Sequence, residues 1–240
     1  MIAGTLFKNR KKRPGDESGF SLVEMLVALA LTGLVLAAVY KTLGAQQKVF
    51  SVQEQSVDMQ QNLRAATDLM VKDLRIAGMD PLATANAGIL TATANTMRFT
   101  MDITGGTAPE FADGNTTGTD EDLTYWLDSL KLKRKLDATL VGGVRKDEDD
   151  IVARNIQAID FFYTFRNGTQ ATAPVAPMTA NDIRLVQVTI LARNPVADKD
   201  YRNTNTYTMP SGTVLGPYND GYRRRLITTS VRLRNMGFRQ

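Results

Sequence analysis

The first third of the chain contains two hydrophobic patterns in succession. Residues 20–39 are apolar at nearly every position, with a single charged side chain at Glu24. A stretch of about 20 such residues is long enough to cross a bilayer as one helix. Beyond it, apolar residues recur every three or four positions, the period of an amphipathic helix. They are Val49, Val52, Met59, Leu63, Ala66, Met70, Leu74 and Ala77. We therefore predict one helix over residues 20–78, with a transmembrane half followed by an amphipathic half.

Gly78 and Pro81 mark the end of this helix, because glycine suits a helix C-terminus and proline cannot continue the helix. Alternating segments rich in Thr, Val, Phe and Tyr follow and predict antiparallel strands. These strands cover residues 89–93, 96–103, 123–127, 130–136, 159–165, 183–192 and 226–233, while 151–157 fits a strand or a short helix. The predicted fold class is α+β, a long N-terminal helix packed on an antiparallel β-sheet. The predicted domains are a basic leader (1–19), the helix (20–78) and a β-rich globular domain (79–240).

The charge distribution predicts which side of the membrane each end of this helix lies on. The basic residues before it are Lys8, Arg10, Lys11, Lys12 and Arg13. The positive-inside rule predicts that they stay in the cytoplasm and that the chain after residue 39 lies outside. The leader carries +3 of the formal net charge of +4, which leaves the remainder near +1. We therefore expect no nucleic-acid partner. The basic clusters at 131–135 and 223–225 are interpreted as charged strand faces or subunit contacts.

Two residue types are absent from the 240-residue chain, His and Cys. Their absence excludes catalytic triads that use histidine, thiol catalysis, imidazole or thiolate metal sites, and disulfides. The sequence also contains neither a P-loop nor a dinucleotide fingerprint. We therefore expect a non-enzymatic protein without a cofactor, stabilised by packing.

Three further features leave alternatives open. The acidic stretches 113–115 and 120–122 supply oxygen ligands but lack the EF-hand pattern. We expect an exposed acidic loop there, with Asp113, Asp120 and Asp122 as weak calcium candidates. The run 147–150 is interpreted as an exposed turn. Trp126 is expected in the core. A loop over 195–221 is either a partner-binding surface or a variable connection, and the tyrosines in or beside it are Tyr201, Tyr207, Tyr218 and Tyr222.

Glu24 requires a specific explanation. A charge inside a bilayer costs roughly 2.5–3.5 kcal/mol on insertion scales, so intramembrane carboxylates usually have a partner. If the chain is cut after Gly19, Phe20 acquires a cationic amino group. A neighbouring copy of the helix, shifted along its axis, could then place that amine beside Glu24.

The sequence Gly-Phe-Ser-Leu-Val-Glu at residues 19–24, followed by an apolar helix, resembles the class III signal of type IV prepilins and type II pseudopilins. The resemblance implies that a prepilin peptidase cuts between Gly19 and Phe20 and that Phe20 is N-methylated. It also implies that Glu24 is the carboxylate that assists docking into a growing filament.

Later segments resemble the PilW-type minor pilins. They are residues 62–66, 73–81, 155–161 and 221–236. This resemblance implies a pilin fold and a minor subunit that primes pilus assembly near the tip. The implied partners are other minor pilins, the major pilin, the prepilin peptidase and the inner-membrane assembly platform. The implied location is the inner membrane, by a single pass with a periplasmic domain, and then the pilus. The chain departs from many pilins in lacking a C-terminal disulfide, and from typical major pilins in lacking a helix proline.

Two alternatives remain. A type II secretion minor pseudopilin has the same signal and the same charge chemistry. An envelope adhesin or enzyme could also be carried on a pilin-like anchor, although the lack of His and Cys argues against an enzyme.

Overall fold

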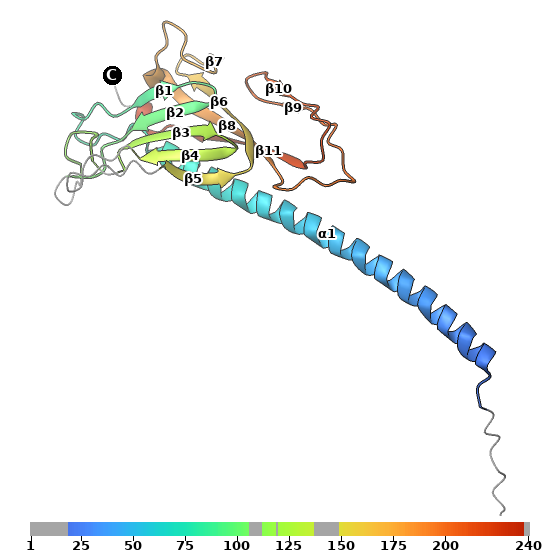
Figure 1. Ribbon diagram of the computed structural model, residues 1–240. Coiled ribbons are helices and arrows are strands. Elements are labelled where there is room, and N and C mark those ends of the chain that lie inside the picture. The colour runs from blue at the N-terminus through green and yellow to red at the C-terminus, as the bar shows by residue number, and fades with distance from the viewer. Residues whose placement is uncertain (1–18, 106–111, 119, 137–148, 238–240) are drawn as a thin grey trace, which may run out of the picture. The chain divides into compact units, whose positions relative to one another are not determined.

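The computed structural model describes residues 19–105, 112–118, 120–136 and 149–237. The predicted leader, apart from Gly19, and the first two residues of the acidic run 147–150 lie outside these residues. The chain forms two compact units, Met1–Ser51 and Val52–Gln240. The helix α1, Leu22–Ile76, has 55 residues and contributes to both units (Figure 1). The predicted long helix is therefore confirmed, and it starts two residues later than expected.

Ser21 explains where α1 begins. Its hydroxyl oxygen accepts a hydrogen bond from the backbone N–H of Glu24, at 3.1 Å. Its carbonyl accepts the first helical bond, from Met25, also at 3.1 Å. Serine is a favoured N-cap because its side chain satisfies a donor that the first helical turn leaves free.

Within the second unit, α1 is amphipathic as predicted. Its buried residues are Met59, Leu63, Ala66, Thr67, Met70, Asp73 and Leu74. The predicted stripe extended further towards the N-terminus, but Val49 is 55 % exposed. The buried face therefore starts at Met59, where the helix meets the sheets.

The helix ends as the sequence predicts. Gly78 has φ +73°, a conformation that residues with a Cβ rarely adopt. Its N–H donates to the Thr100 carbonyl at 2.9 Å. A Cβ on Gly78 would lie 2.4 Å from the Met236 sulfur. The side-chain amide of Asn235 donates to the carbonyls of Arg75 and Ala77. The C-terminal segment thus caps the end of α1.

The strands form two main sheets rather than the single sheet expected, and every pairing is antiparallel. The first has the order β1-β2-β3-β4-β5. Its strands are β1 (Ile89–Ala92), β2 (Thr96–Thr100), β3 (Asp122–Asp128), β4 (Lys131–Leu136) and β5 (Asp149–Arg154). The second has the order β11-β8-β6-β7. Its strands are β6 (Ile156–Phe165), β7 (Gln170–Ala171), β8 (Ile183–Arg193) and β11 (Arg224–Arg232). The remaining elements are the hairpin β9 (Tyr207–Thr208) and β10 (Val214–Leu215), and two 3₁₀ turns, η1 (Ala180–Asp182) and η2 (Asn235–Gly237).

Asn155 explains why there are two sheets. It adopts φ +59° between β5 and β6, so the chain turns within the ambiguous segment 151–157 and passes from one sheet to the other. The Ile156 N–H donates to the Leu130 carbonyl next to the first sheet, and the Asn155 carbonyl accepts from Arg193 in the second. The segment is therefore strand on both sides of one left-handed residue.

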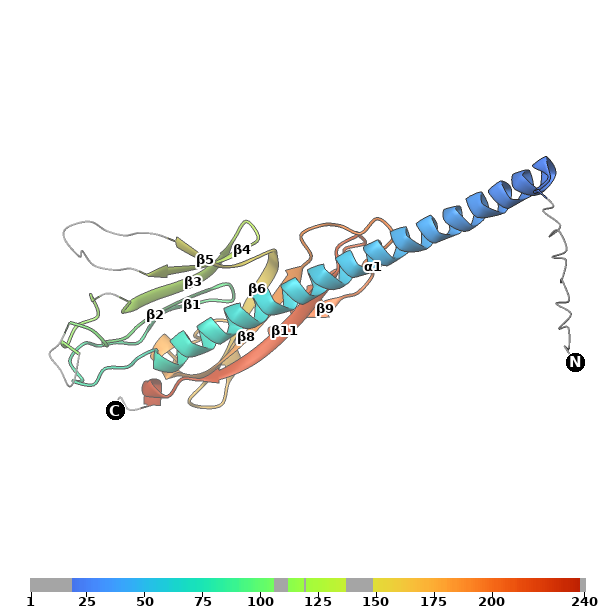
Figure 2. The ribbon, with the colours of Figure 1, turned by 90° about the horizontal axis from the view of Figure 1, so that it is seen from below.

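The core lies where α1 meets the two sheets (Figure 2). Its largest fully buried aromatic residues are Tyr125, Tyr163, Phe99 and Phe161. The prediction that Trp126 is a core residue was wrong. Successive side chains of a strand point to opposite faces, so the buried position of Tyr125 places Trp126 on the outer face of β3. There Trp126 is half-buried, with the Lys133 ammonium 5.8 Å from its ring.

Candidate functional site

The segment before α1 is open to solvent. Gly19, Phe20 and Ser21 are exposed and non-helical, and Phe20 is 84 % exposed. A Cβ on Gly19 would meet no atom within 4 Å, so packing within the described residues does not require a glycine here. The peptide bond between Gly19 and Phe20 therefore lies in an exposed, non-helical segment, where an endopeptidase could reach it.

Glu24 is exposed in the first turn of α1. Ser21 and Glu24 have the Ser-x-x-Glu spacing of a capping box, but only the half donated by the Glu24 backbone forms. Within the described part of the chain, the Glu24 carboxylate has no hydrogen-bond or ion-pair partner. It can therefore accept a cation from another molecule.

The apolar run of α1 lacks internal partners. Every large apolar side chain over residues 22–39 is 49–77 % exposed. Among the described residues, α1 is the one helix that is long and apolar enough to span a membrane. A continuous apolar surface of this kind requires lipid or other helices around it.

In the second unit, a buried polar contact ties α1 to the first sheet. The Asp73 carboxylate accepts hydrogen bonds from the Tyr125 hydroxyl (2.6 Å) and from Nε of Arg134 (2.8 Å). Tyr125 and Arg134 are cross-strand partners on β3 and β4. Burial, and then the neighbouring Asp73 charge, raises the pKa of Tyr125, so its hydroxyl remains a donor at neutral pH. This contact fixes the helix against the sheet.

The acidic loop is organised by the carboxylates of Asp102 and Glu121. The expectation of an exposed stretch at 120–122 was wrong for Glu121 and for Asp122, which begins β3, because both are buried. Asp102 and Glu121 are fully buried. Asp102 accepts the backbone N–H groups of Asp113 and Gly114, and Glu121 accepts those of Ile103, Thr104 and Gly118. They therefore satisfy loop backbone donors.

The three calcium candidates are held differently. Asp122 receives two hydrogen bonds from Arg98, at 2.9 and 2.5 Å. Asp113 accepts the Asn115 N–H, and Asp120 has φ +66°. No group of three or more His, Cys, Asp or Glu side chains that could hold a metal occurs among the described residues.

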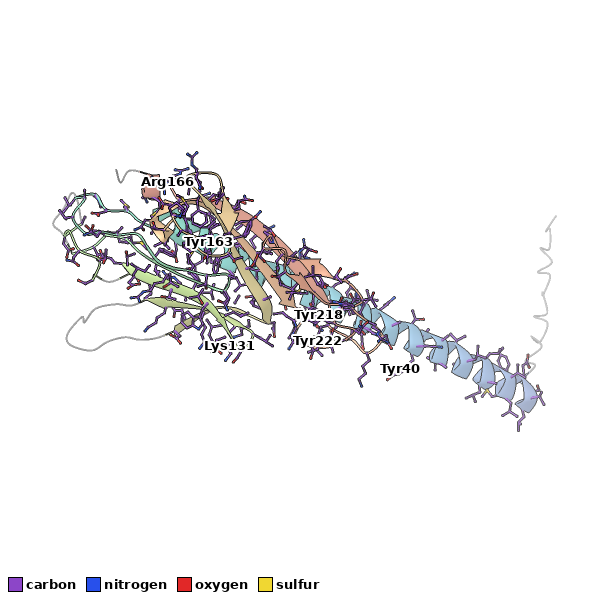
Figure 3. All side chains as sticks on the ribbon, turned by 90° about the horizontal axis from the view of Figure 1, so that it is seen from above. Tyr40, Lys131, Tyr163, Arg166, Tyr218 and Tyr222 are labelled. Atoms are coloured by element: carbon purple, nitrogen blue, oxygen red, sulfur yellow. The ribbon has the colours of Figure 1, made fainter. Side chains whose placement is uncertain are left out.

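Stacked arginines hold the loop over residues 195–221, through the tyrosines in or beside it. The guanidinium carbon of Arg223 lies 4.1 Å from the centre of the Tyr201 ring, and that of Arg193 lies 4.2 Å from Tyr222. The guanidinium carbon of Arg224 lies 3.8 Å from the centre of the Tyr218 ring and 6.0 Å from that of Tyr222. Both tyrosines are labelled in Figure 3. Such stacks fix the planar guanidinium in place.

These arginines also form ion pairs with the loop. Asp220 accepts from both terminal nitrogens of Arg224 at 2.6 Å, which lowers the pKa of Asp220. Arg223 pairs with Asp198 at 3.0 Å. In the other basic cluster, Lys133 pairs with Asp128, and Arg134 with Asp73. Much of the basic charge noted in the sequence is therefore neutralised within the chain.

Asparagines of the later motif segments make contacts between distant elements. The Asn62 side chain donates to the Arg154 carbonyl at 2.9 Å. Asn155 forms the turn between the sheets, and Asn235 caps α1. These three residues hold the fold together, and sequence spacing gave no signal for their partners.

Comparison with known proteins agrees with this arrangement. The model of the prokaryotic N-terminal methylation motif matches residues 15–40, and that of the type IV pilus-assembly protein W family matches residues 133–235. No curated protein matches the chain. Among solved structures, a type IV-like pilin from Thermus thermophilus is similar, with a TM-score of 0.50 and 13 % identity. The similarity covers 74 % of this chain and 97 % of that one, and it shows the fold. The chain is therefore similar to the type IV pilus-assembly protein W family over residues 133–235, and it combines an N-terminal methylation motif and an apolar N-terminal helix with a pilin-like fold.

Proposed function

We propose that this protein is a minor type IV pilin that primes pilus assembly near the pilus tip, after cleavage between Gly19 and Phe20. The observation that carries the proposal is the N-terminal segment. An exposed glycine precedes a capped helix, and the one carboxylate in the apolar run of that helix, Glu24, lacks a partner in the described chain. The family match over residues 133–235 favours a pilus-assembly subunit over an adhesin or enzyme on a similar anchor.

In the proposed mechanism, the basic leader holds the N-terminus in the cytoplasm while α1 spans the inner membrane. The prepilin peptidase hydrolyses the bond between Gly19 and Phe20, and the new amine on Phe20 is methylated. A secondary amine of this kind stays protonated near neutral pH, so methylation keeps the cation.

Assembly then moves the apolar helix from lipid into a helix bundle. The Glu24 carboxylate of one subunit pairs with the N-terminal amine of its neighbour. The pair neutralises two charges that would be costly to bury separately. The proposed partners are the other minor pilins, the major pilin and the inner-membrane assembly platform, and the folded unit stays in the periplasm until extrusion.

A type II secretion pseudopilin would share every step up to filament growth. Deletion of the gene distinguishes the two roles. Loss of surface pili with normal enzyme export supports the pilin, and loss of enzyme export with normal pili supports the pseudopilin.

Replacing Gly19 with valine is expected to abolish processing without disturbing the fold, because no atom within 4 Å constrains this position. The side chain would enter the space that the peptidase must occupy beside the scissile bond. The measurement is the mass of the membrane-fraction protein from cells that contain the peptidase. We expect almost all of it to keep the leader.

The matched control is Gly44→Val, since Gly44 also has open space around it and lies beyond the cleavage site. This variant should be cut normally. Normal cleavage of Gly19→Val would contradict the assignment of Gly19.

A further inference from the structure

The strand β11 is the outermost strand of the second sheet, with β8 on one side. At its two ends, the Arg223 carbonyl accepts from the Asn194 N–H and the Leu233 N–H donates to the Arg184 carbonyl. The register between these points has no shift. In an antiparallel strand the N–H and C=O groups of alternate residues point to the same side. The backbone N–H and C=O groups of the odd-numbered residues of β11 therefore face β8.

The even-numbered residues present their backbone groups at the free edge. They are Arg224, Leu226, Thr228, Ser230 and Arg232. No strand pairs with this side of β11 within the described residues. The edge is nine residues long, whereas the other sheet edges, β1, β5 and β7, have four, six and two. It contains no proline and no bulge. Long edges without these features are templates for another strand.

A groove lies beside β11 and is lined by residues of α1 and β11. Its volume is about 230 Å³, and it is lined by Gln60, Leu63, Arg64, Thr67, Asp68, Arg225 and Ile227. A strand added to β11 would point every second side chain towards α1. Such a groove can select those side chains while the backbone ladder supplies affinity.

The charges beside the edge determine which side chain would fit. Arg64 and Arg225 line the groove. Both are exposed, and neither makes a hydrogen bond or ion pair within the described chain. Asp68 is the one acidic residue that lines the groove. The surface is therefore net positive and favours an acidic side chain.

We propose that the free edge of β11 receives an extended segment of a different subunit of the assembly, which bears an acidic side chain that reaches Arg64 and Arg225. This proposal rests on the proposed assembly role and names the contact that would join the two subunits. The added segment would pair with the N–H and C=O groups of the even-numbered residues.

The experiment uses the full chain in cells, with the photoreactive residue benzoylphenylalanine in place of Gln60. Irradiation should yield a crosslink to one pilus subunit, and digestion should place it in a segment with alternating apolar residues and an aspartate or glutamate. Ser230→Pro removes one outward N–H and should reduce the crosslink at least tenfold. Ser230→Ala keeps that N–H and should leave the crosslink unchanged.

Proline is tolerated at an edge position whose N–H faces solvent, so Ser230→Pro should unfold within a few degrees of Ser230→Ala. If it does not fold, the double variant Arg64→Glu and Arg225→Glu replaces it. This variant should also lose the crosslink, whereas Arg75→Glu on the same helix should keep it.

The unmodified chain separates the two proposals. If the unmodified chain enters sheared pili but the benzoylphenylalanine variant crosslinks only to a second copy of itself or to no protein, the edge contact is overturned while the assembly role stands. An unchanged crosslink in Ser230→Pro has the same meaning. If the processed, unmodified chain is absent from pili, the assembly role itself fails.

Discussion

Glu24→Gln is expected to prevent the processed protein from entering the pilus, while cleavage and membrane insertion continue. The variant keeps the size and the backbone hydrogen bond to Ser21 but removes the negative charge. The N-terminal amine of the neighbouring subunit would then enter the bundle without a counter-charge, at a cost of a few kcal/mol. Since about 1.4 kcal/mol is a factor of ten, we expect at least a tenfold fall in the amount of this protein in sheared pili.

The control is Glu54→Gln, an exposed acid further along the same helix. It should enter pili as the unmodified protein does. Equal incorporation of Glu24→Gln and Glu54→Gln would remove Glu24 from the assembly mechanism.

Asp73→Ala is expected to lower the free energy of unfolding of the globular unit by about 3 kcal/mol or more, the range for breaking one partner of a buried ion pair. The Arg134 side chain is 14 % exposed and the Asp73 side chain 6 %. The variant would leave the guanidinium and the Tyr125 hydroxyl without their acceptor. Urea unfolding of the full chain in detergent, followed by near-ultraviolet circular dichroism, measures the change.

Asp68→Ala is the matched control, since it removes an exposed aspartate from the same helix. We expect it to change the free energy of unfolding by less than about 0.5 kcal/mol. If Asp73→Ala costs no more than this control, the contact between Asp73, Tyr125 and Arg134 does not hold α1 to the sheet.

The elements that follow from short-range pattern could be predicted. The period of the apolar residues identified α1, and Gly78 marked its end because its positive φ is a local requirement. The alternating segments identified the longer strands. The N-terminal methylation motif could also be predicted, since Gly19, Phe20 and Glu24 lie within six residues of one another.

Features that depend on distant partners could not be predicted. Asp73 lies among charged residues of α1, and its partners are 52 and 61 positions away. The burial of Asp102 and Glu121 depends on how the loop between them folds back. The division into two sheets depends on the left-handed turn at Asn155, and the free edge of β11 is visible only once its register with β8 is known.

The most direct test of the central claim is the mass of the N-terminal peptide of this protein, isolated from cells with and without the prepilin peptidase. We predict a peptide that starts at N-methylated Phe20 when the peptidase is present, and a chain that retains its leader when it is absent. A protein from peptidase-containing cells that keeps residues before Gly19, or that is cut after Val39, would contradict the account and make this protein an ordinary anchored or secreted envelope protein.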